Sequence, residues 1–72
     1  MYIIKGNPTL TGKITIEDLT LVSAYLLGTK TLTGDAFIAA DVNNDGVVDI
    51  VDLANIKFHI LGQKMITEVV RK

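Results

Sequence analysis

Acidic side chains are concentrated in one short stretch of this 72-residue chain. Four of the eight acidic residues, Asp41, Asp45, Asp49 and Asp52, lie within twelve consecutive positions. Carboxylates so close together repel one another unless a cation neutralises them. Because the formal net charge of the chain is only −1, this excess of negative charge is local. The stretch is therefore a candidate site for a metal cation.

The spacing within the stretch favours one cation, calcium. With Asp41 as position 1, candidate oxygen ligands stand at positions 1, 3, 5, 7, 9 and 12, which are Asp41, Asn43, Asp45, Val47, Asp49 and Asp52. In the EF-hand loop, which has this spacing, position 7 contributes a backbone carbonyl and a glycine, here Gly46, allows the bend at position 6. Magnesium is disfavoured because it requires a smaller octahedral shell and keeps its waters. The pattern predicts one calcium ion in this loop, and a solvated Asx-rich turn is the alternative.

The chain contains an internal repeat with an offset of 34 residues. Residues 7–28 and 41–62 are identical at six of 22 aligned positions, and their shared apolar residues have helical spacing. Each repeat is predicted to be a loop followed by an amphipathic helix, which stops at Gly28 or Gly62. A tetratricopeptide repeat has the same period, but the Gly-centred turn and the missing aromatic and small-residue signature exclude it.

The first loop keeps the turn and lacks the charge. Its positions 1, 3, 5, 9 and 12 are Asn7, Thr9, Thr11, Thr15 and Asp18, and only the last is charged. Because the calcium affinity of such loops depends on ligand charge, we expect no ion here. Threonine hydroxyls that bond to the local backbone would hold the shape instead. Weak calcium binding through Asn7, Thr9, Thr11 and Asp18 is the alternative.

The segments outside the two repeats are short. Residues 35–40 are predicted to form a short helix, with Thr33 as a possible N-cap. Residues 2–4 and 69–70 are strand-like in composition. Either these two segments pair as a short antiparallel clasp, or they are two frayed tails.

Residues 39–53, AADVNNDGVVDIVDL, followed by a helix that ends at Leu61 and Gly62, resemble the second half of a dockerin. The aspartate at position 12 and the very short segment before the loop both fit that family. The resemblance, over residues 7–62, implies one mainly α domain of two antiparallel loop–helix half EF-hands with a short connecting helix. Its parts would be repeat one (7–28), a connecting segment (29–40), repeat two (41–62) and a C-terminal tail (63–72).

The resemblance also implies a function. Dockerins are secreted bacterial modules that bind a cohesin and so anchor their parent proteins to a cellulosome-type scaffold for polysaccharide degradation. In the family, the cohesin contacts loop positions 10 and 11 and the pair near positions 17 and 18. The corresponding residues here are Ile16, Glu17, Ser23 and Ala24 in repeat one, and Ile50, Val51, Lys57 and Phe58 in repeat two.

The two contact sets differ, so we expect a single binding mode with the second helix as the main contact. An exposed cluster of Ile50, Val51 and Phe58 would mark an interaction site. The alternative for Ile16 and Ile50 is that both belong to the core. His59, the only histidine, is expected to lie on the surface or at the partner contact.

Composition argues against other classes of function. The chain has no cysteine, which excludes disulfides and thiolate zinc sites. It has no basic patch that would indicate nucleic acid, and no apolar run of about 20 residues that would span a membrane. It also lacks catalytic signatures, so we expect a non-enzymatic module that is monomeric when free, with any export signal outside this chain. The alternative functions are an isolated calcium sensor or a structural domain with no cohesin partner.

Overall fold

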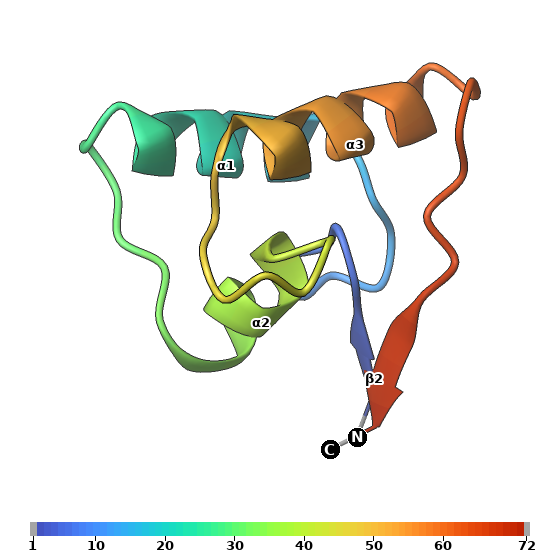
Figure 1. Ribbon diagram of the computed structural model, residues 1–72, viewed down its shortest axis with the longest axis horizontal. Coiled ribbons are helices and arrows are strands. Elements are labelled where there is room, and N and C mark those ends of the chain that lie inside the picture. Colours follow the sequence, from blue (N-terminus) through green and yellow to red (C-terminus); the bar gives the residue numbers. More distant parts are fainter. Residues whose placement is uncertain (1, 72) are drawn as a thin grey trace.

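The computed structural model describes residues 2–71. In chain order these residues form β1 (Tyr2–Ile4), α1 (Ile16–Leu26), α2 (Gly34–Ala40), α3 (Ile50–Ile60) and β2 (Val69–Arg71). In Figure 1, α1 and α3 run antiparallel along one side of the molecule, α2 lies beneath them, and the two strands meet below. The mainly α architecture of two loop–helix repeats and a short connecting helix is confirmed.

The two long helices begin in the same way. Thr15 and Asp49 are their N-caps, and each side chain accepts a hydrogen bond from the backbone N–H two residues ahead. In return, Asp18 accepts the N–H of Thr15 at 2.8 Å, and Asp52 accepts the N–H of Asp49 at 2.9 Å. This reciprocal capping box fixes both helix starts, and it orients the side chain at loop position 12 towards its own loop.

A small apolar core joins the repeats. Val22 of α1 and Ile56 of α3, which are equivalent in the repeat, are both fully buried. They pack in one cluster with Leu32, Ala40 and Val48. Because Val48 belongs to the second loop, its burial ties that loop to the core.

The two strands, near either end of the described residues, are paired. β1 and β2 form an antiparallel ladder with Ile3 opposite Val70 at its centre, and Ile3 is fully buried. The clasp is therefore the correct alternative, and the frayed tails are not. Ile66 leads into β2, and its backbone N–H donates to Nδ1 of half-buried His59 at 2.9 Å. His59 thus holds the C-terminal segment against α3, a role that the sequence did not indicate.

The short helix α2 contacts β1 and leads directly into the second loop. Thr33 occupies the predicted N-cap position, but its side chain makes no capping hydrogen bond. At the other end of α2, the buried ammonium group of Lys5 donates to the carbonyl oxygens of Ile38 at 2.8 Å and Asp41 at 3.0 Å. Lys5 therefore connects the clasp to the first residue of the calcium-type loop. None of the helices within residues 2–71 has the length and hydrophobicity needed to cross a membrane.

Candidate metal centre

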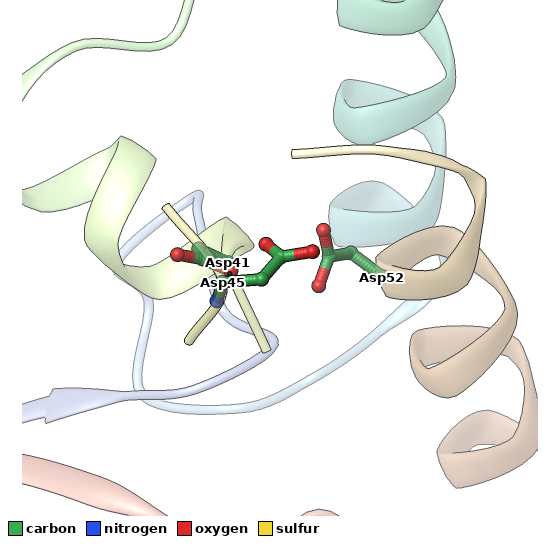
Figure 2. A group of neighbouring side chains, drawn as sticks. All are labelled: Asp41, Asp45 and Asp52. Atoms are coloured by element: carbon green, nitrogen blue, oxygen red, sulfur yellow. Dashed lines mark hydrogen bonds between the residues drawn. The ribbon is translucent and has the colours of Figure 1, made fainter. Parts of the chain in front are cut away.

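Three of the predicted ligands converge at the start of α3. Carboxylate oxygens of Asp41, Asp45 and Asp52 all lie within 4.8 Å of one another. Figure 2 shows Asp52 reaching from the helix towards the other two side chains in the loop. Asp41 and Asp52 are buried, while Asp45 is exposed. A cluster of three carboxylates is a hard oxygen donor set, and it fits calcium.

Backbone hydrogen bonds hold the loop around this cluster. Asp41 accepts the N–H of Gly46 at 3.0 Å and that of Asp45 at 3.3 Å, so its side chain spans the turn. Gly46 has a φ of 88°, which a residue with a β-carbon adopts only with strain. The sharp bend predicted at position 6 is confirmed. Asn44 also adopts a left-handed conformation, with a φ of 59°.

Asp52 joins the two ends of the loop. Its carboxylate accepts the N–H groups of Val42 at 2.9 Å and Asn43 at 3.3 Å, in addition to that of Asp49. Burial raises the pKa of Asp52 above its ordinary value, and the negative charge of Asp41 adds to this effect, while the backbone hydrogen bonds lower the pKa. The charged form is therefore held at a cost that a nearby cation would offset.

The other predicted ligands lie in the same loop but outside the carboxylate cluster. The side chain of Asp49 accepts the N–H of Val51 at 3.1 Å and so caps α3. Position 9 of such loops often binds the ion through a water molecule, which is compatible with this capping role. Asn43 and Val47 are exposed residues of the loop.

The first loop has a similar backbone and a different interior. Leu10 and Gly12 have φ values of 59° and 93°, matching Asn44 and Gly46 at the same loop positions. Sequence reasoning assigned the shape of this loop to its threonines, and Thr11 does donate to the carbonyl of Lys13 at 3.2 Å. The larger contribution comes from Asn7, which is buried and bonded to several loop oxygens.

The predicted partner residues lie mostly on the outer side of α1 and α3. Ile16 is 60% exposed and Ile50 is 65% exposed, so the alternative that they belong to the core is wrong. Val51, Lys57 and Phe58 are also exposed, whereas Ser23 and Ala24 are half-buried. Two further leucines, which sequence reasoning missed, are also exposed at the ends of these helices: Leu27 and Leu61. Their identity at equivalent positions of the repeat was the available signal.

Comparison with known proteins agrees with this geometry. A family model described as the dockerin type I domain matches residues 11–61, which is more than half of the chain. No curated protein and no solved structure gave a significant match. The matched segment begins within the first loop and ends just after α3, so it contains all three helices and the whole carboxylate cluster. The chain belongs to the dockerin type I domain family.

Proposed function

We propose that this domain is a calcium-stabilised adhesion module that binds a cohesin and anchors its parent protein to a cellulosome-type scaffold. Dockerin domains are non-catalytic and bind cohesins in general. The observation that carries the proposal is the apolar outer side of α3, where Ile50, Val51 and Phe58 are exposed. An isolated structural domain has no use for such a surface, whereas a binding module requires one. A calcium sensor would need paired loops that respond to the ion, and the first loop has a single carboxylate at its ligand positions.

The proposed calcium site takes one ion in the second loop. Asp41, Asp45 and Asp52 would bind through carboxylate oxygens, Asn43 through its side-chain oxygen and Val47 through its backbone carbonyl. Asp49 would act through a bridging water while it caps α3. The ion would neutralise the clustered carboxylates and stabilise the start of the helix that carries the exposed apolar residues.

The proposed location follows from the proposed partner. Cellulosome components are extracellular, so the parent protein is proposed to be secreted by a bacterium and to take part in polysaccharide degradation. The module supplies attachment, and any catalysis would belong to another part of the parent protein. We propose that the free module is monomeric.

The test of the partner is a binding assay with immobilised cohesins of different types. We expect at least one cohesin to retain the module in calcium and to release it in chelator. A module that is folded in calcium by circular dichroism, yet is retained by none of the cohesins, would contradict the proposed function. That result would favour a structural domain without a cohesin partner.

The test of the ion is calorimetry on matched variants. We expect one ion per chain and a loss of binding in Asp41→Ala or Asp52→Ala. These two side chains also hold the loop backbone, so Asp45→Asn is the cleaner variant, and it should weaken affinity by roughly tenfold or more because ligand charge sets affinity. Asp35→Asn removes the same charge outside the loop and should leave affinity unchanged. Two sites of comparable affinity would contradict the proposal.

A further inference from the structure

The side chain of Asn7 has the same place in the first loop as Asp41 has in the second. Asn7 Oδ1 accepts the N–H of Gly12 at 2.8 Å, just as Asp41 accepts the N–H of Gly46 at 3.0 Å. An N–H group requires an acceptor, so this bond fixes which end of the Asn7 amide carries oxygen. The amide nitrogen must therefore point into the loop.

Inside the loop, this nitrogen faces oxygens only. Asn7 Nδ2 lies 2.8 Å from the carbonyl of Lys13, 3.0 Å from Asp18 Oδ1 and 3.2 Å from each of the hydroxyls of Thr9 and Thr11. These acceptors stand at loop positions 3, 5, 7 and 12. The same positions of the second loop supply the candidate calcium ligands. One amide group thus connects the oxygens that a cation would otherwise draw together.

The negative charge of the first loop is stabilised by hydrogen bonds within the loop. Asp18 is the one carboxylate at its ligand positions, and it is fully buried. In addition to the Asn7 amide, it accepts the N–H of Thr9 at 3.1 Å, the hydroxyl of Thr9 at 2.7 Å and the N–H of Thr15 at 2.8 Å. Four donors, all from its own loop, thus surround the buried carboxylate of Asp18.

We propose that the Asn7 amide takes the place of a metal ion in the first loop, so that repeat one keeps its folded shape in the absence of calcium. The two N–H bonds of the Asn7 side-chain amide carry partial positive charge. This charge attracts the oxygens at loop positions 3, 5, 7 and 12. The carboxylates of the second loop repel one another and lack such an internal donor at position 1. The calcium requirement of the module is therefore confined to repeat two. This inference concerns loop one and holds whether or not a cohesin binds.

The first test is Asn7→Asp, which keeps the shape of the side chain and removes both N–H donors. It also places a second carboxylate against Asp18. In chelator, the variant should melt several degrees below the wild type, and added calcium should recover this loss and fill one additional site by calorimetry. Asn43→Asp makes the same change at position 3 of the second loop, and it should add no site. A variant as stable as the wild type in chelator would overturn the proposal, as would a wild-type first loop that itself binds calcium.

The second test uses the wild type, so it can contradict the proposal even if Asn7→Asp fails to fold. Amide hydrogen exchange is measured in calcium and in excess chelator. The N–H groups of Thr9, Gly12 and Thr15 should keep their protection when calcium is removed, while those of Val42 and Gly46 should lose it. Equal loss of protection in both loops would show that calcium supports both, and it would overturn the proposal.

Discussion

Asp18 and Asp52 show how one residue type has two roles in this domain. Both are fully buried at position 12 of a loop, and both accept the N–H of their helix N-cap. Asp18 is surrounded by donors from its own loop, including the Asn7 amide. Asp52 instead faces two other carboxylates. The backbone role is shared by the repeats, and the proposed metal role belongs to Asp52 alone.

The pKa of Asp52 leads to a prediction about pH. Burial raises this pKa in the metal-free fold, whereas the unfolded chain has an ordinary aspartate value of about 3.9. Between these two values the folded state binds more protons than the unfolded state, so Asp52 contributes stability at low pH that is lost as the pH rises through the folded pKa. Calcium binds only the ionised carboxylate, so its affinity falls as the pH falls through the same window.

We therefore expect the difference in melting temperature between calcium and chelator to shrink as the pH is lowered from about 7 towards the raised pKa of Asp52. Thermal melts over a pH series, at fixed calcium and at fixed chelator, measure this difference. Asp52→Asn is the control, and it should show little effect of calcium at any pH. A calcium effect of constant size across the series would contradict the prediction.

At the scale of elements, the clasp is attached to the metal loop through one side chain. Lys5 follows β1 directly, and its buried ammonium group bonds to the carbonyls of Ile38 and Asp41. These carbonyls lie at the C-terminal end of α2, where a positive charge is also favoured by the helix dipole. The position of the first calcium ligand thus depends on a residue 36 positions earlier in the chain.

Replacement of Lys5 by methionine should destabilise the whole domain. It keeps the apolar stem but leaves two carbonyl oxygens without their charged donor, at a cost of about 2–3 kcal/mol. Urea denaturation in calcium measures the change in the free energy of unfolding. Lys64→Met, at an exposed position, is the matched control and should change stability by less than about 0.5 kcal/mol. A similarly small effect of Lys5→Met would refute the proposed attachment.

Most of the elements follow from local sequence. The helical spacing, the glycine stops and the ligand pattern lie within each repeat, so they predict α1, α3 and the second loop. The strand-like composition of the two end segments allowed the clasp as one alternative. The register of Ile3 with Val70 and the bonds of Lys5 join residues far apart in the chain, and no local signal fixes them. The amide of Asn7 was missed for another reason. In the sequence, an asparagine in place of an aspartate at position 1 indicates only that the loop has lost a negative charge. The role of its amide as a hydrogen-bond donor becomes visible only when the structure shows the oxygens around it.

At the scale of the whole molecule, the helices of the two repeats are similar on the side that faces the core and differ at several outer positions. Val22 and Ile56 are equivalent in the fold and equally buried. On the outer side, position 11 is Glu17 in one repeat and Val51 in the other, and position 18 is Ala24 against Phe58. A rotation of 180° would therefore superpose the backbones but not the surfaces that a partner would contact.

This asymmetry predicts a single orientation of the module on its cohesin. Rotation would replace Phe58 by the methyl group of Ala24 and would place the Glu17 carboxylate where Val51 had been. The loss of a buried aromatic side chain costs roughly 3–5 kcal/mol in a well-packed site. Because about 1.4 kcal/mol corresponds to a factor of ten, even half of that cost favours one orientation by more than tenfold. We expect the preferred orientation to place α3 at the centre of the contact.

The test compares variants of the two helices against the cognate cohesin. Phe58→Ala combined with Val51→Glu should remove most of the affinity for the cohesin. The double variant presents a small side chain and a charge at positions where the wild type presents two apolar side chains to the partner. Ala24→Asp changes the equivalent position of α1 and should have little effect. Circular dichroism in calcium must show that both proteins are folded, since Phe58 and Ala24 are each partly covered by the domain itself. If the two orientations were equally populated, each change would disable only one of them, and equal partial losses from both variants would exclude a single binding mode.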